Sequence, residues 1–500
     1  MNASTHSVGQ GMAQGAAWMV LMRLVMRGAS LINMMIMARL LVPEDFGLVA
    51  MAMIFVGAID IFSEFNFDVA LIKKQTAGRT DYDTAWTLSI IRGVVVAVLL
   101  LAIAGPAAEL FDEPRLAPII AALSVSPLLL GLQNIGVVDF RKSLDFRRDF
   151  LFMAGAKVAA VIVTICLAML WRNYWALVGG IVGGNLWRVV ASYAMHPHRP
   201  KGSLAGWREL FAFTKWLLLQ NVLLYFRNRA DRLVIGRVLG AATLGVYTLA
   251  YELANLVTSE LIAPVRRALL PGFSMLSDEP ARMRGMFVDV FALTLWIGAP
   301  IPIGIGLLAE PLVALLLGNS WAAAVPVIQM LVIAGFAALL SSGSQPVYLA
   351  YGRPEIQTLL VGLSAVLLLP AIIAGVALKG AIGAAIAVVV VQTLIALVDI
   401  LIVTSLLQLD RKVIAAASWR SIVALGLMAA FVHAITRAWP TGGDVVGNAL
   451  LLLSAMAAGG TVYLACSFVL WRLTGSDRGP ESHVWHLIVG AVTALRTKFA

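Results

Sequence analysis

The chain has 500 residues, of which 60% are hydrophobic and only 13% charged, with a formal net charge of +10. A soluble protein carries about twice that charged fraction, and apolar runs of about 20 residues, enough to span a bilayer, recur from end to end. These features exclude a soluble protein and predict an all-α polytopic membrane protein. We expect the positive charge to lie in cytoplasmic loops and not to bind nucleic acid.

The apolar segments predict about 14 transmembrane helices, roughly 20 residues or longer, joined by short connections. The first six cover residues 14–42, 46–72, 82–104, 117–139, 149–171 and 174–195. Six more cover residues 209–236, 243–270, 287–316, 321–349, 355–378 and 381–407, and two extra helices cover 419–437 and 446–471. The polar N-terminus lacks the pattern of a cleaved signal peptide.

Lysine and arginine are distributed unequally between the two alternating sets of loops. One set contains KKQTAGR, RKSLDFRR and HRPKGSLAGWR, whereas the other, with PED and FDEPR, contains far fewer basic residues. Because cytoplasmic loops carry the excess of positive charge, we predict a multi-pass membrane protein with both termini in the cytoplasm.

A repeat relates the two halves of the chain. ARLLVPEDFGLVA aligns without a gap on GRVLGAATLGVYT, so that Gly47 falls on Gly245, and in the same register Trp18 falls on Trp216. Because both units begin in the cytoplasm, we expect two parallel six-helix bundles with pseudo-two-fold symmetry, an architecture of secondary transporters. The predicted domains are an N-terminal bundle (1–208), a C-terminal bundle (209–407), the two extra helices (408–472) and a cytoplasmic tail (473–500).

Ionisable residues inside apolar spans are energetically costly and therefore mark functional candidates. The basic candidates for a substrate-binding cavity are Arg23, Arg27, Arg92, Lys157, Arg227, Arg229 and Arg232. The acidic candidates for charge pairing or ion coupling are Asp60, Glu64, Asp68, Asp231, Glu252 and Glu260. The excess of cations predicts an anionic ligand, since arginine binds phosphate through paired hydrogen bonds.

The residue pattern leaves alternatives open for these charges. They line a ligand path, or they are interhelical ion pairs that only fix the packing. The cluster from Arg227 to Arg232 either belongs to the outer part of the path or forms a collar at the membrane interface. Asp231 lies one turn after Arg227 and is expected to orient it. Glu252 either carries a coupled proton or sodium ion or neutralises nearby arginines. No cofactor, metal site or catalytic residue is expected.

Three stretches resemble one known family: ARLLVPEDFGLVAMAMIFVGAIDIFSEFNFDVALIKK, NRADRLVIGRVLGAATLGVYTLAYELA and PVRRALLPGFSMLSDEP. They are similar to the polysaccharide transporters, the Wzx-type oligosaccharide flippases of the multidrug/oligosaccharidyl-lipid/polysaccharide flippase superfamily. The resemblance covers nearly the whole chain. It implies translocation of an undecaprenyl-diphosphate-linked oligosaccharide across the bacterial inner membrane, by alternating access, for lipopolysaccharide or exopolysaccharide biosynthesis.

The same resemblance implies partners and residue roles. The partners are the lipid-linked oligosaccharide, membrane lipids, and a polysaccharide polymerase and export proteins. Cavity arginines on the early spans of lipid II flippases are thought to engage the diphosphate, and Arg23 and Arg27 occupy suitable places here.

Three other functions compete with this one. A lipid II flippase and a multidrug exporter belong to the same superfamily, but exporters of cationic drugs favour acidic and aromatic cavities. A membrane enzyme that acts on the outer face is disfavoured because the predicted outer loops are too short to build a catalytic site. The sequence contains no GxxxxGK[ST] phosphate-binding motif, which excludes a fused ABC transporter.

Overall fold

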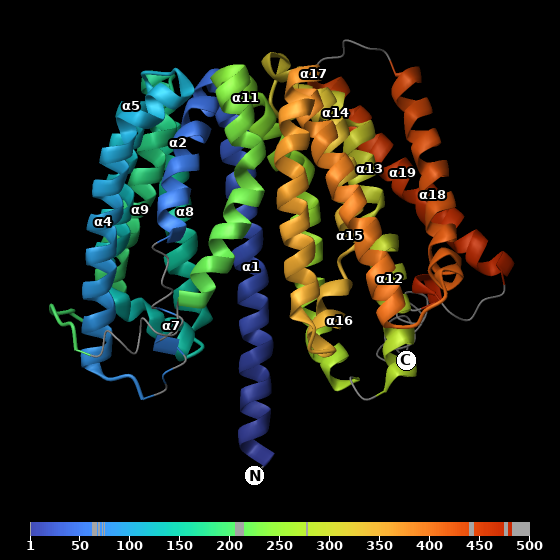
Figure 1. Ribbon diagram of the computed structural model, residues 1–500, viewed down its shortest axis with the longest axis horizontal. Helices are drawn as coiled ribbons and strands as arrows, with labels where there is room; N and C mark the ends of the chain where they lie inside the picture. Colours follow the sequence, from blue (N-terminus) through green and yellow to red (C-terminus); the bar gives the residue numbers. More distant parts are fainter. Residues whose placement is uncertain are drawn as a thin grey trace, which may run out of the picture. The chain divides into compact units, whose positions relative to one another are not determined.

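The computed structural model of the protein describes residues 2–62, 68, 71–72, 74, 76–205, 215–276, 279–439, 445–474 and 479–482. Within these ranges the secondary structure is helical, without a β-strand, as expected from the sequence (Figure 1). The chain divides into two compact units, Met1–Thr248 and Leu249–Ala500.

The N-terminal unit consists of long helices interrupted by short ones. Its elements are α1 (Asn2–Leu40), α2 (Pro43–Phe62), α4 (Arg79–Phe111), α5 (Leu116–Leu123), α6 (Val125–Leu132), the 3-10 turn η1 (Ile135–Val137), α7 (Val138–Lys142), α8 (Phe146–Trp171), α9 (Trp175–Met195) and the first part of α11 (Lys215–Met275). Helix α8 packs against both α1 and α9, whereas α4 packs against α5 and α6.

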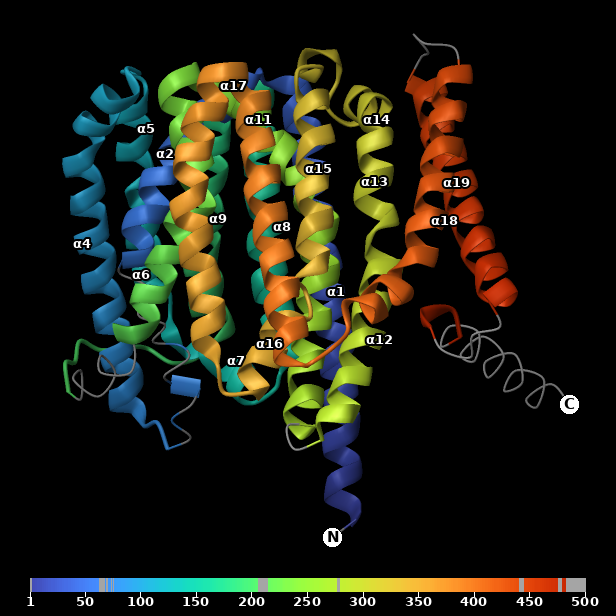
Figure 2. The same cartoon turned by 45° about the vertical axis from the view of Figure 1, so that its right-hand side comes forward.

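The C-terminal unit begins in the second part of α11. It continues with α12 (Pro280–Gly298), α13 (Pro300–Leu307), α14 (Ala309–Leu316), η2 (Asn319–Trp321), α15 (Ala324–Leu340), α16 (Ser344–Ala350), α17 (Pro354–Leu406), α18 (Arg411–Ala438) and α19 (Val445–Thr474). Helix α15 packs against α17, and α18 packs against α19 (Figure 2).

Two of the longest helices contain a break where the sequence predicts a connection between spans. In α11 the backbone of Gly240 adopts a φ of 78°, and in α17 that of Gly380 adopts a φ of 58°. Residues with a Cβ rarely adopt a positive φ, so glycine is suited to these two positions. Each break thus separates two distinct helices, one for each of two predicted spans.

The helices carry an apolar surface suited to lipid. Leu170, Val366 and Leu378 leave 70% or more of their surface exposed, which would be costly in water but not against hydrocarbon. In the described ranges, nine helices are long and apolar enough to cross a membrane, or up to ten if one bent pair is counted as a span. Each of the predicted spans overlaps a helix, and the number of about fourteen stays a prediction.

Candidate functional site

The N-terminal unit contains a polar cavity of about 270 Å³. Its walls come from α4, α6, η1, α7, α8 and α9, together with Asp68. Three arginines, Arg92, Arg141 and Arg188, and two aspartates, Asp68 and Asp149, line it. Ionised groups at membrane depth normally face a bundle interior or a water-filled space. This cavity supplies that environment for these five charged side chains.

Two of these arginines are held by carboxylates. Arg92 on α4 forms a hydrogen-bonded ion pair with Asp60 on α2. Arg141 on α7 lies between two carboxylates, with its guanidinium 3.4 Å from Asp68 and 3.3 Å from Asp149. The sequence predicted Arg92, Asp60 and Asp68 as candidates, and the structure brings them to this cavity or to its lining residues.

Short capping interactions position the wall that carries Arg141. The Asn134 side chain accepts a hydrogen bond from the Gly136 amide at 3.0 Å and so starts η1, which leads into α7. The Asp145 side chain accepts from the Arg148 amide at 3.1 Å and starts α8. Such caps satisfy amides that the first helical turn leaves without partners. They place Arg141 and the first turn of α8 side by side.

Arg188 on α9 differs from the other two arginines because it makes no hydrogen bond or ion pair with any residue that the structure describes. The positive charge of Arg141 lies close enough to repel the guanidinium of Arg188. Sequence reasoning missed both residues. The sequence analysis placed Arg141 in a basic loop. Arg188 lies inside a predicted span, and a charge within an apolar span is the signal that identified Arg92.

A second basic group lies where α1 packs against α8. The positive charges of Arg27 on α1 and Lys157 on α8 lie close enough to repel each other across this contact. Arg23 lies one turn before Arg27 and therefore on the same face of α1. The structure thus brings together basic residues from the first and fifth predicted spans. Glu64, another sequence candidate, lies outside the described residues.

The third group of candidates lies on α11. Asp231 and Arg232 are both buried, with 5% of their surface exposed. Asp231 accepts hydrogen bonds from the hydroxyl of Tyr247 at 3.0 Å and from the Arg232 amide at 2.8 Å. The Asp231–Tyr247 bond joins the two sides of the break at Gly240. The Arg229 guanidinium lies 6.0 Å from the centre of the Tyr225 ring.

The side chain of Arg227, a further sequence candidate on α11, lies outside the described part of the chain. The same holds for the side chain of Glu260. Glu252 is described and is exposed on α11. The expectation that Asp231 orients Arg227 therefore stays a prediction, as does the ion-coupling role of Glu252.

Two buried carboxylates lie in the described part of the C-terminal unit. Asp399 on α17 accepts a hydrogen bond from the Tyr348 hydroxyl of α16 at 2.7 Å. Glu481 lies 3.4 Å from Arg420 of α18, and both side chains are almost fully buried. Sequence reasoning missed this second pair because it assigned Glu481 to a cytoplasmic tail. Among the described residues, no group of three or more His, Cys, Asp or Glu could hold a metal ion.

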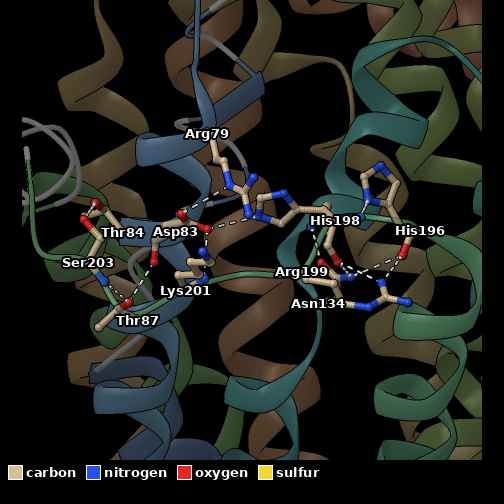
Figure 3. A network of polar contacts seen from close by, with 11 residues as sticks. Arg79, Asp83, Thr84, Thr87, Asn134, His196, His198, Arg199, Lys201 and Ser203 are labelled. Atoms are coloured by element: carbon tan, nitrogen blue, oxygen red, sulfur yellow. Dashed lines mark hydrogen bonds and ion pairs between the residues drawn. The ribbon is translucent and has the colours of Figure 1, made fainter.

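The loop after α9 is tied to the start of α4 by a polar network (Figure 3). The carboxylate of Asp83 accepts a hydrogen bond from the Lys201 amide at 3.0 Å and lies 3.3 Å from His198. The Asn134 side chain donates to the His198 carbonyl at 2.7 Å. Because Asn134 also starts η1, this network fixes the loop after α9 against one wall of the polar cavity, and we assign it a structural role.

The chain is similar to known proteins in sequence and in fold. The family model described as "Polysaccharide biosynthesis protein" matches residues 36–326. The chain is 26% identical over 385 residues to the lipopolysaccharide biosynthesis protein WzxC of Escherichia coli (strain K12), which covers 76% of this chain and 78% of WzxC. It is also 26% identical over 326 residues to the succinoglycan biosynthesis transport protein ExoT of Rhizobium meliloti (strain 1021), covering 64% and 65% of the two chains.

Two solved structures show the same fold at low sequence identity. The lipid II flippase MurJ in an inward closed conformation superposes with a TM-score of 0.71 at 13% identity, over 91% of this chain and 100% of MurJ. An inward-facing multidrug resistance transporter of the MATE family superposes with a TM-score of 0.62 at 13% identity, over 79% of this chain and 98% of that one. At this identity the likeness concerns architecture.

Proposed function

The chain belongs to the polysaccharide biosynthesis protein family, and on that premise we propose that it is a flippase for a lipid-linked oligosaccharide. It would move an undecaprenyl-diphosphate-linked oligosaccharide across the bacterial inner membrane for lipopolysaccharide or exopolysaccharide biosynthesis. WzxC and ExoT, by their names, serve lipopolysaccharide biosynthesis and succinoglycan transport. Their roles support a transporter and not an enzyme.

The observation that carries the proposal is the gathering of basic side chains on membrane helices of the N-terminal unit. Arg27 and Lys157 act on each other across the contact of α1 with α8, and Arg23 shares the face of Arg27. Ionisable side chains gathered on membrane helices mark a candidate ligand site, and an excess of cations suits an anionic ligand. A diphosphate is such an anion, and guanidinium groups bind it through paired hydrogen bonds.

The parts of the substrate would then meet different parts of the protein. The diphosphate would bind the basic side chains, the sugars would stay in water, and the prenyl chain would remain in lipid. Arg229 and Arg232 of α11, with Arg227, would belong to the same path. Alternating access would carry the head group from the cytoplasmic to the periplasmic leaflet, driven by a proton or sodium gradient or by the membrane potential.

The finer assignments of topology and partners belong to the same proposal. Both termini would lie in the cytoplasm, as the loop charges indicate. The domains would follow the predicted division at residues 208, 407 and 472. A polysaccharide polymerase and export proteins would receive the translocated substrate, and Glu252 would carry the coupled ion.

A lipid II flippase is the second candidate, and the MurJ-like fold favours it. The family match favours the polysaccharide substrate instead. Depletion in the host distinguishes the two, since loss of a lipid II flippase causes lysis and loss of an oligosaccharide flippase removes surface polysaccharide. A multidrug exporter has support from the MATE fold alone, and its cationic substrates would be repelled by the basic group.

Transport in proteoliposomes tests the proposal directly. A fluorescent undecaprenyl-diphosphate oligosaccharide would be followed in liposomes containing the wild type, Arg27→Ala or Arg282→Gln. Arg282 is a matched control because its guanidinium is exposed and pairs with a neighbour in sequence, 2.8 Å from Glu279. We expect transport by the wild type and the control, and a loss of about tenfold or more for Arg27→Ala, equivalent to at least one charged hydrogen bond. Absence of transport by folded wild type would refute the function.

A further inference from the structure

The charges around the polar cavity of the N-terminal unit are compensated unevenly. Arg92 is paired with Asp60, and Arg141 is shared between Asp68 and Asp149. Arg188 lines the same cavity but makes no hydrogen bond or ion pair within the described chain. Among the residues that the structure describes, no carboxylate therefore pairs with this cation.

The position of Arg188 makes this arrangement costly. It lies seven residues before the end of α9 at Met195, about 10 Å along the helix axis. Its side chain is partly buried, and the nearby charge of Arg141 repels it. Removing a charge from water is unfavourable unless a partner or hydrogen bonds compensate it. An anion between Arg141 and Arg188 would remove both the burial cost and the repulsion.

We propose that Arg188, together with Arg141, binds a phosphate group in this cavity. Guanidinium groups bind phosphate oxygens through parallel hydrogen bonds, and Gln133 adds an amide to the same lining. The volume of about 270 Å³ accommodates a phosphate with several waters. This site is separate from the basic group of Arg23, Arg27 and Lys157, none of which lines the cavity.

The phosphate can come from two sources. One is the diphosphate of the lipid-linked substrate, and this reading rests on the proposed function. The depth of Arg188 suits it, since about 10 Å from a helix end lies near the boundary between head groups and hydrocarbon. The other source is a free phosphate or diphosphate from the aqueous phase. The same arginine would bind either one.

Thermal unfolding of the purified full chain tests the site. The melting temperature would be measured in sodium pyrophosphate and in sodium chloride of equal ionic strength, for the wild type, Arg188→Gln, Arg188→Lys and Arg147→Gln. Arg147 is the matched control, because it is an exposed arginine at the start of α8 outside the cavity. We expect pyrophosphate to raise the melting temperature of the wild type and of Arg147→Gln by a few degrees.

The variants at Arg188 separate binding from a structural role. Arg188→Gln should lose the pyrophosphate effect and Arg188→Lys should retain part of it. In chloride, Arg188→Gln should be at least as stable as the wild type, since it removes a partly buried charge that has no ion-pair partner among the described residues. A pyrophosphate effect that persists in Arg188→Gln would overturn the proposal, and so would a large loss of stability of this variant in chloride.

Native mass spectrometry with undecaprenyl phosphate identifies the source. Bound lipid that falls about tenfold in Arg188→Gln but not in Arg147→Gln would assign the site to the lipid head group. Lipid binding that is unchanged, with a lost pyrophosphate effect, would assign it to free phosphate. If the wild type fails to transport the oligosaccharide but still shows the Arg188-dependent pyrophosphate effect, the proposed function fails and the phosphate site remains.

Discussion

Gly47 of α2 and Gly245 of α11 pack directly against each other at equivalent positions of the sequence repeat. A Cβ added to Gly47 would lie 1.7 Å from the carbonyl oxygen of Ala241, and one added to Gly245 would lie 1.8 Å from that of Pro43. The repeat aligns Pro43 with Ala241 just as it aligns the two glycines. The contact is therefore reciprocal, as a two-fold relation between the repeated units requires.

Gly245→Ala tests this contact. The clashing atoms belong to the backbone of α2 and cannot rotate away, so the helices must separate. We expect a loss of about 1–3 kcal/mol in the free energy of unfolding, typical of overpacked sites, measured by thermal or denaturant unfolding in detergent. Gly426→Ala on α18 is the control, since nothing lies within 4 Å of its Cβ position. Equal destabilisation by both substitutions would show that the contact has no special role.

Tyr247→Phe tests the bond across the break in α11. It removes the hydroxyl that donates to the buried Asp231, and an unsatisfied buried polar group costs about 1–3 kcal/mol. Adding Asp231→Asn should make the double variant less unstable than the sum of the two single changes. Tyr174→Phe is the control, because no described residue bonds to the Tyr174 hydroxyl. Strict additivity of the unfolding free energies would contradict the coupling.

The loop after α9 should be held less firmly in mild acid. His196, the first residue of this loop, lies 3.3 Å from Asp139 of α7. Burial lowers the pKa of His196 below its ordinary value of 6.5, although Asp139 opposes the shift. The unfolded chain then takes up a proton near pH 6.5 and the folded chain only at lower pH. Stability is thus fully present above pH 6.5 and falls as the pH drops through that value. Melting temperatures at pH 7.5 and 5.5 should diverge less for His196→Gln than for the wild type, and parallel changes would refute the assignment.

Removing one partner of the buried Arg420–Glu481 ion pair should destabilise the C-terminal unit. Arg420 and Glu481 lie 3.4 Å apart with 7% and 1% of their side chains exposed. Arg420→Met leaves a buried carboxylate without its cation, so we expect a loss of about 3–5 kcal/mol. The double variant Arg420→Met/Glu481→Leu should recover most of it. Unfolding in detergent measures both, and a double variant no more stable than the single one would contradict the pairing.

Several features of the molecule follow from local sequence patterns. Apolar runs long enough to cross a bilayer predict helices because every backbone amide in lipid must be satisfied within its own segment. The same pattern predicted the connections that became the breaks at Gly240 and Gly380. Arg27, Arg92 and Lys157 were identified because a charge in an apolar span stands out without any knowledge of its neighbours.

The sequence by itself thus determined the membrane class, the helices, the repeat and the family, because each depends on residues close together in the chain or on similarity along it. The tertiary structure decided which charges meet. It paired Arg92 with Asp60 and placed Arg141 between two aspartates. It also placed Arg188 beside them, where no carboxylate of the described residues pairs with it. It also brought Glu481 to Arg420 from the expected tail. These outcomes depend on which helix faces pack together, and that choice is made by contacts between segments far apart in the chain.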